Sequence, residues 1–268
     1  MTPSPEAASG PTIRLIGRPD FDVSAFLDYL ASEHLEWART QGATSAEELT
    51  EVAGRLCYMS FGPRQSPRKN RDYILNLVAQ GHESVLEHIG WTFLLTGVSR
   101  SFSHQFVRHR VGFAFSQLSQ QYADQRGMLV LMPELVKSSK PLAEVWERAV
   151  AEARTAYERI LRELESSLPD TPGTGSARWE QRRAIRSAAR SVLPEAMETR
   201  IVFTANARAI RHFLEVRGGV PGDLEMRLVA SELLSLVNKE APSVFADFET
   251  IEHEGWPLVR RTRQGGPE

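Results

Sequence analysis

The sequence predicts an α+β protein built as a single domain, with helices more abundant than strands. Three observations lead to this prediction. Apolar residues at spacings of three and four recur along most of the chain, most clearly over 141–168. Two runs rich in strand-forming residues, 91–98 and 198–206, interrupt the helical pattern. No repeat or low-complexity linker divides the 268 residues, so we expect one domain.

In the first third of the chain, helical spacing predicts helices over 22–35 and 46–56. The segment GPRQSPRKN, at 62–70, is polar and contains two prolines, so it predicts a loop. A further helix is expected over 72–80, because apolar spacing returns there and Gly81 provides a stop.

The later elements follow the same rules. WTFLLTGV and ETRIVFTAN predict the two strands, because both are rich in β-branched and aromatic residues. A run containing Pro and Gly, at 169–176, separates two helices. Residues 1–12 are expected to form a disordered lead-in and 256–268 a tail, which leaves 13–255 as the domain. The expected helices, which share an apolar stripe, cover 101–110, 141–168, 178–193, 207–217 and 223–239.

The composition is that of a globular protein, with 41% hydrophobic and 25% charged residues. Cys57 is the only cysteine and cannot form an internal disulfide, so a reducing, cytoplasmic setting is expected. No run approaches 18 consecutive apolar residues, and the N-terminus lacks the regions of a signal peptide. Neither a membrane partner nor export is therefore expected.

The basic residues are strongly biased, with 28 Arg against 4 Lys. Two explanations stand at this point. A GC-rich genome favours arginine codons, and arginine also offers a planar, permanently charged fork that suits phosphate and carboxylate groups. The formal net charge of −2 argues against a nucleic-acid partner, because non-specific binding to nucleic acid needs an extended basic surface.

Several catalytic and metal-binding signatures are absent or incomplete. Neither a G-x-G-x-x-G nor a Walker A run occurs. HESVLEH resembles a zinc-protease motif, but His82 and His88 are six residues apart and fall on different helix faces, so no metal is expected. Cys57 lies among apolar neighbours without an activating base, which favours a buried, inert thiol over a nucleophile.

The densest polar feature is the segment 100–122, RSFSHQFVRHRVGFAFSQLSQQY. On a helix, Arg108, His109 and Arg110 fan over about 200° and cannot all be buried without anions or carboxylates to satisfy them. Phenylalanines and neutral amides follow, an order that suits an anionic ligand with flat rings. A solvated basic helix end followed by a polar strand explains the same pattern, and the residues alone leave both interpretations open.

A second concentration of arginine lies within 178–217, with nine Arg, no Lys and four Glu. Arg182, Arg186 and Arg190 recur at every fourth residue, so we expect them on one helix face. An anion or an acidic partner surface would offset the repulsion among them. Asn206 begins the next predicted helix, whose exposed backbone N–H groups would add to a phosphate site.

These residues occur in the order typical of the flavin-dependent thymidylate synthases, the ThyX family, which the chain resembles over roughly 50–245. The family signature is R-H-R, a short spacer and Ser, matched here by Arg108-His109-Arg110 leading to Ser119. The other matching landmarks are Ser60 in MSF, GHES at 81–84, EH at 87–88, Gln105, ARSVLP with Arg190, TANAR with Asn206 and Arg208, RHFLEVR with His212 and Arg217, and LEMR ending at Arg227.

The resemblance implies a central mixed or antiparallel sheet flanked by helices, and an FAD enzyme that methylates C5 of a uridine 5′-monophosphate. Methylenetetrahydrofolate would donate the one-carbon unit, and NADPH would reduce the flavin. The chain would form a homotetramer with shared active sites. No cysteine nucleophile is needed in this family, which agrees with the surroundings of Cys57.

The resemblance also implies roles for individual residues. Arg217 is expected to be catalytic, because a fixed cation near N3 of the pyrimidine stabilises negative charge in the ring, and His82 is expected to assist. The residues expected to contact FAD are Ser60, Ser84, Arg108, His109, Arg110, Gln117, Asn206, Arg208 and His212. Those expected to contact the nucleotide are Gln105, Arg108, Gln117, Ser119, Gln121, Arg190 and Arg217.

Two departures fall inside the signature. Eight residues, rather than the usual seven, separate Arg110 from Ser119, and Gln121 stands where the family usually has a nucleotide-contacting arginine. The change to Gln removes a charge-assisted hydrogen bond, and the extra residue alters the loop that holds the sugar and base. Two interpretations stay open: a branch that methylates uridine monophosphate in nucleoside-antibiotic biosynthesis, or a deoxyuridine monophosphate enzyme with a variant loop.

Two other classes of protein remain as alternatives. Loss of catalysis through Gln121 would leave a catalytically altered paralogue that binds flavin and nucleotide without methylating. An Arg-rich RNA-binding domain would bind RNA in a salt-dependent way and carry no flavin.

Overall fold

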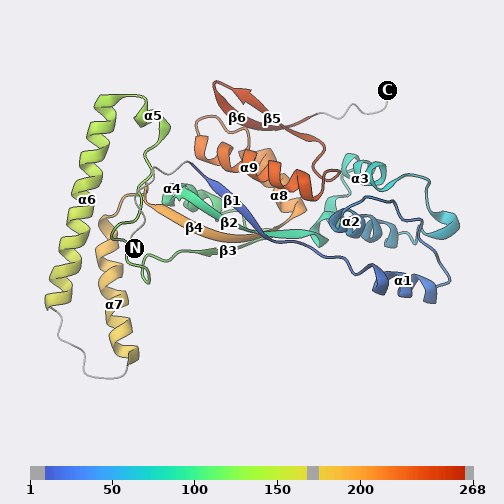
Figure 1. Cartoon of the computed structure of the whole chain (residues 1–268), viewed down its shortest axis with the longest axis horizontal. Coiled ribbons are helices and arrows are strands. Elements are labelled where there is room, and N and C mark those ends of the chain that lie inside the picture. Colours follow the sequence, from blue (N-terminus) through green and yellow to red (C-terminus); the bar gives the residue numbers. More distant parts are fainter. Residues whose placement is uncertain (1–9, 168–174, 263–268) are drawn as a thin grey trace. The chain divides into compact units, whose positions relative to one another are not determined.

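The computed structural model describes residues 10–167 and 175–262. It contains both helices and strands and confirms the predicted α+β class (Figure 1). A four-stranded sheet has the strand order β1-β2-β4-β3, and a two-stranded sheet is formed by β5 and β6. The described chain divides into two compact units. Unit 1 consists of 96–108 and the described part of 116–201, and unit 2 of 11–95, 109–115 and 202–262.

The elements divide between the units as follows. Three strands run through both: β2 (Gly90–Ser99), β3 (Phe113–Gln117) and β4 (Glu198–Asn206). Unit 1 adds α4 (Arg100–Phe106), α5 (Glu134–Lys137), α6 (Lys140–Ser167), α7 (Gly175–Ala189) and the 3₁₀ turn η3 (Arg190–Val192). Unit 2 adds β1 (Thr12–Gly17), α1 (Val23–Ser32), α2 (Ser45–Leu56), η1 (Gly62–Arg64), α3 (Asn70–Ala79), η2 (Glu83–His88), α8 (Ala207–Arg217), α9 (Leu224–Glu240), β5 (Phe248–His253) and β6 (Trp256–Arg261).

The core of unit 2 follows from the period-two pattern of its strands. Phe93 of β2 and Phe203 of β4 are fully buried, and their rings stack with centroids 5.0 Å apart. Helix α8 packs its apolar face inward through Ile210, Phe213 and Leu214, all fully buried. The polar face of α8 is therefore left for a site, and its exposed residues include Arg208 and His212.

Unit 1 contains the two long helices α6 and α7, which lie side by side and antiparallel (Figure 1). Tyr157 and Leu161 of α6 pack with Ile185 and Ala189 of α7 in one buried cluster. These positions are four residues apart on each helix, the spacing at which side chains share a face. The predicted break at 169–176 falls largely on residues outside the described part of the chain, and α7 already begins at Gly175.

Agreement between sequence and structure is closest at β4 and α8, whose ends match the predicted 198–206 and 207–217. The predicted helix over 101–110 is too long, since α4 ends at Phe106. The N–H of Arg108 bonds to the carbonyl of Gln105, which tightens the last turn, and Gly112 then adopts a φ of +72° that ends the segment. The Arg-His-Arg motif therefore lies beyond the helix.

Two further expectations are corrected. Residues 256–261, expected in a tail, form β6, which pairs with β5 from Phe248↔Arg261 to His253↔Trp256. The two turn residues Glu254 and Gly255 have positive φ, the backbone that a tight hairpin needs, so Glu-Gly was the signal missed. Cys57 is exposed rather than buried, because it follows the last residue of α2.

The remaining boundaries differ in smaller ways. β1 was not expected and begins at Thr12, and the rest of the predicted lead-in falls largely on residues 1–9, outside the described chain. The limits of the predicted domain 13–255 stay a prediction. Among the helices that the structure describes, none has the length and apolar character required to cross a membrane.

Candidate active site

The segment that follows the Arg-His-Arg motif is fixed against the start of α8. Asn206 caps this helix, because its Oδ1 accepts a hydrogen bond from Ala209 N at 2.9 Å. The N–H of Asn206 donates to the carbonyl of Gly112 at 3.1 Å. A Cβ at Gly112 would lie 2.7 Å from the Ala209 Cβ and 2.8 Å from the Asn206 amide, so only glycine fits.

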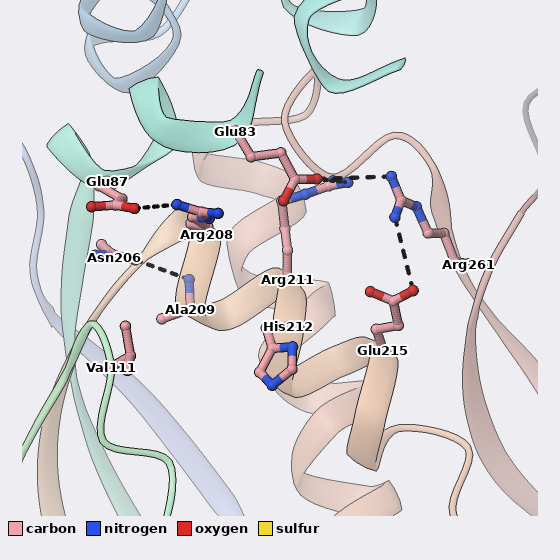
Figure 2. Close-up of a pocket in the computed structure, with 10 residues that line it drawn as sticks. All are labelled: Glu83, Glu87, Val111, Asn206, Arg208, Ala209, Arg211, His212, Glu215 and Arg261. Carbon is pink, nitrogen blue, oxygen red and sulfur yellow. Dashed lines mark hydrogen bonds and ion pairs between the residues drawn. The ribbon is translucent and has the colours of Figure 1, made fainter. Parts of the chain in front are cut away.

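A cavity of about 440 Å³ opens beside this helix start (Figure 2). Arg208 and His212 lie one turn apart on the exposed face of α8 and both border the cavity. Arg208 forms an ion pair of 2.5 Å with Glu87, and both side chains are about half exposed (51% and 47%). The full lining comprises Glu83, Glu87, Val111, Asn206, Arg208, Ala209, Arg211, His212, Glu215 and Arg261.

One side of the cavity is held by a buried arginine that the sequence analysis missed. Arg211 donates to both carboxylate oxygens of Asp247, at 2.6 and 2.7 Å, and to Glu83 at 3.3 Å. Arg261 also donates to Asp247, at 2.7 Å. Burial alone would raise the pKa of Asp247, but the hydrogen bonds and charges of Arg211 and Arg261 lower this pKa below its ordinary value. Figure 2 shows Arg211 and Arg261 beside Glu83, with Arg261 also directed at Glu215.

The predicted catalytic arginine contacts the histidine of the motif. Arg217, at the end of α8, donates from Nε to Nε2 of His109 at 3.2 Å. Burial, together with the charges of Arg217 and His212, lowers the pKa of His109 to about 4. His109 is therefore neutral near pH 7, with Nε2 as an acceptor. Its ring also meets Phe213 edge to face, with centroids 5.2 Å apart.

Four other predicted site residues of unit 2 form no hydrogen bond or ion pair with His109 or Arg217 in the described chain. Ser60 donates from Oγ to the Arg55 carbonyl at 3.4 Å, so it borders a buried arginine. His82 and Ser84 are exposed at the start of η2. Their neighbours Glu83 and Glu87, rather than these two residues, line the cavity. Arg110, the last residue of the motif, is exposed.

The residues predicted for the nucleotide lie mostly in unit 1. Ser119 forms a turn in which its Oγ accepts from Gln121 N at 3.2 Å. The amide of Gln117 donates to Ser103 Oγ at 2.9 Å and to Thr199 Oγ1 at 3.1 Å, so it is engaged within the unit. Gln105 and Arg108 are exposed, and Arg190 is half-buried at the start of η3.

Arg182 and Arg186 of the predicted row lie on α7, and Arg190 follows at the start of η3. Contacts with the segment after Ser119 come from Arg183, whose Nε donates to Gln121 Oε1 at 3.2 Å, and from Arg186, which donates to the Tyr122 carbonyl at 2.5 Å. Arg182, expected in the row from its spacing, is exposed and has no such contact in the described chain. The i+4 pattern therefore identified the helix, and the packing makes Arg183 and Arg186 the arginines that contact the segment after Ser119.

Comparison with known proteins decides the family. The family described as "Thymidylate synthase complementing protein" matches residues 40–243, which include both the motif and α8. The chain belongs to the flavin-dependent thymidylate synthase family.

Relatives within this family match nearly the whole chain. A protein of Mycobacteroides abscessus named flavin-dependent thymidylate synthase is 40% identical over 223 residues, which cover 83% of this chain and 86% of that protein. The same name and the same identity and coverage apply to a protein of Mycobacterium tuberculosis. A Corynebacterium aurimucosum protein of that name is 39% identical over 230 residues, covering 85% of this chain and 90% of its own length.

For a member of the flavin-dependent thymidylate synthase family, the structure separates the motif residues into two groups. His109, Arg217 and His212 meet at α8, where the helix geometry brings them together. Gln117, Ser119 and Gln121 make their contacts within unit 1 instead. Within the residues that the structure describes, no group of three or more His, Cys, Asp or Glu is placed to hold a metal ion.

Proposed function

We propose that this protein is an FAD-dependent methyltransferase that methylates C5 of a uridine 5′-monophosphate. In this proposal methylenetetrahydrofolate is the one-carbon donor and NADPH the reductant, and four copies assemble as a cytoplasmic homotetramer with shared sites. The observation that carries the proposal is the contact between His109 of the motif and Arg217 of α8, in a chain 40% identical to proteins named flavin-dependent thymidylate synthase.

The surface at the start of α8 has the chemistry needed to hold FAD. Backbone N–H groups at a helix start favour an anion such as a diphosphate, and the exposed guanidinium of Arg208 lies in the same turn. The ion pair of Arg208 with Glu87 is solvent-exposed and contributes at most about 1 kcal/mol, so a phosphate can displace the carboxylate. FAD, when bound, supplies the redox chemistry, which no side chain of the protein provides.

Arg217 acts on the nucleotide in this proposal. A permanently charged guanidinium beside the pyrimidine stabilises negative charge that develops in the ring during methyl transfer. His109 stays neutral, with a pKa of about 4, and accepts a hydrogen bond from Arg217 Nε. This hydrogen bond orients the guanidinium and leaves its terminal N–H groups for the substrate. His109 is thus a positioning residue for the catalytic arginine.

The choice between deoxyribose and ribose depends on the segment after Arg110. The extra residue before Ser119 and the neutral amide of Gln121 support acceptance of uridine monophosphate as well as the deoxynucleotide. The contacts of the Gln121 amide with Arg183 and Ser187 use one of its two oxygen lone pairs and one of its two N–H groups. The remaining donor and acceptor can pair with a 2′-hydroxyl, which a guanidinium would meet only as a donor.

The test is a methylation assay on purified full-length protein with FAD, NADPH and methylenetetrahydrofolate. Uridine and deoxyuridine monophosphates are supplied in parallel, and products are identified by mass. Methylation of either nucleotide supports the proposal, and a strict preference for the deoxynucleotide removes the ribose part. Bound flavin without methylation of either would indicate the catalytically altered paralogue, and salt-sensitive RNA binding without flavin would overturn the proposal.

A further inference from the structure

Gln121 is held by helix α7 through its side-chain amide. Arg183 donates from Nε to Gln121 Oε1 at 3.2 Å, and Gln121 donates from Nε2 to Ser187 Oγ at 3.4 Å. These two partners are four residues apart on α7, so they grip the amide from one face of the helix. The amide is thereby fixed in orientation, with its oxygen toward the guanidinium.

The charge of Arg183 is left without a carboxylate partner. Its side chain is exposed, its Nε is used by a neutral amide, and the guanidinium lies over the Tyr122 ring at 5.9 Å. No ion pair involves Arg183 among residues 10–167 and 175–262. By contrast, Arg126 in the same unit is paired with Asp124. The terminal N–H groups of Arg183 are therefore free to bind an anion in the bidentate manner typical of arginine.

Arg183 belongs to a row of arginines rather than standing alone. Arg186 and Arg190 follow at three and seven residues, so the three lie along one side of α7 and η3. Neither Arg186 nor Arg190 forms an ion pair with a described residue. Burial lowers the pKa of Arg100, and the charge of Arg190 lowers it further, while the charge of Glu195 raises it. The charge of Arg186 is partly balanced by Asp124, whose pKa is lowered by its hydrogen bond to Arg126 and by Arg186. Arg183 has no such carboxylate among the described residues, so its charge is available to a bound dianion.

We propose that Arg183 binds the 5′-phosphate of the nucleotide and supplies the positive charge that Gln121 lacks. Gln121 positions the guanidinium of Arg183 by accepting its hydrogen bond at Oε1, and the bond from Gln121 Nε2 to Ser187 fixes the amide itself. Arg183 lies seven residues, about two helical turns, before Arg190. The inference rests on the proposed function, because it takes a uridine monophosphate as the ligand.

The experiment measures the affinity of full-length, FAD-loaded protein for uridine and deoxyuridine monophosphates by calorimetry. Arg183→Ala is expected to raise the Kd of both monophosphates by about 10-fold or more, the loss of one charge-assisted hydrogen-bonded contact. Arg182→Ala is the matched control: it removes the same charge from the adjacent exposed position and is expected to change Kd by less than about twofold. The nucleoside uridine, which lacks the phosphate, is expected to bind both variants equally.

A double variant tests position rather than charge alone. Gln121→Arg in the Arg183→Ala background places a guanidinium where the amide now lies, and is expected to restore the Kd to within about threefold of the unmodified protein. Equal losses in Arg182→Ala and Arg183→Ala would reduce the effect to net charge and overturn the inference, as would an unchanged Kd in Arg183→Ala. If the unmodified protein binds neither monophosphate, the proposed function fails first and the inference with it.

Discussion

The arginines around the cavity of unit 2 and those of the row on α7 and η3 in unit 1 have different partners. In unit 2, Arg208, Arg211 and Arg261 each contact a carboxylate, and Arg211 is almost fully buried between Asp247 and Glu83. In unit 1, Arg183 and Arg186 of the row donate to the neutral Gln121 and to the Tyr122 carbonyl. The pKa of Asp124 is lowered chiefly by its hydrogen bond to Arg126 and also by the charge of Arg186. The cavity arginines are therefore paired with carboxylates, whereas Arg183 of the row has a neutral hydrogen-bond partner.

The 28 arginines of the chain, against 4 lysines, therefore include at least two kinds of side chain. A paired, buried arginine fixes the shape of a cavity, and its charge is already neutralised. An exposed arginine held through one N–H by a neutral group keeps both its charge and its remaining donors for a ligand. Position among carboxylates, rather than number, distinguishes the arginines that support a site from those that bind.

The largest effect is expected from the buried network of unit 2. Arg211→Met leaves Asp247 in the interior with Arg261 as its remaining partner, and should lower the free energy of unfolding by about 3 kcal/mol or more. Chemical denaturation measures this change. Arg183→Met, on the exposed row of unit 1, should shift it by less than about 0.5 kcal/mol. Similar decreases in the free energy of unfolding for Arg211→Met and Arg183→Met would contradict the difference between the paired and the exposed arginine.

The next effect concerns catalysis. Arg217→Ala removes the cation proposed to stabilise the pyrimidine ring, and kcat at saturating nucleotide should fall about 100- to 1000-fold. Flavin content should be retained, because the helix start that holds FAD in the proposal is untouched. Arg182→Ala, which changes charge by the same amount in unit 1, should leave kcat unaltered. A kcat for Arg217→Ala near that of the unmodified protein would remove Arg217 from its proposed role.

A third prediction follows from the pKa of His109, which is about 4 instead of the ordinary 6.5. As the pH falls from 6.5 towards 4, His109 becomes protonated in the unfolded chain but stays neutral in the folded chain. The free energy of unfolding therefore decreases across this pH range. Arg217→Gln should raise the pKa of His109 only part of the way towards 6.5, because burial lowers this pKa more than the charge of Arg217 does. NMR titration of the imidazole measures both values, and a normal pKa in the unmodified protein would contradict the geometry.

The smallest effect is expected at the cap of α8. Asn206→Ala should cost about 1 kcal/mol of unfolding free energy, through loss of the bond to Ala209 N. It should also weaken FAD binding, because the first turn of the helix loses its anchor. Thr44→Ala removes the corresponding cap of α2 and should cost a similar amount without changing FAD affinity. Equal FAD affinity in both variants would place the flavin away from α8.

The match between prediction and structure was closest where one local signal governs a whole element. The strand over 198–206 and the helix over 207–217 were predicted at their true ends, because a β-rich run meets Asn206, a strong helix cap, without interruption. The predicted helix over 101–110 failed because its end depends on Gly112, whose φ is set by the contact with Asn206 nearly a hundred residues away. β6 was missed because a strand needs a partner, here β5, to be recognised.

The family, the order of the motif residues and an arginine-rich helix could all be predicted from the residues alone. These properties reside in residue identity and spacing, which a chain carries before it folds. The packing of the folded chain adds which arginines lie beside carboxylates, that Arg217 donates to His109, and that Arg183 rather than Arg182 contacts Gln121. The physical reason is that one residue on a helix is a turn of about 100°, so the side facing a distant segment is set by packing and not by spacing.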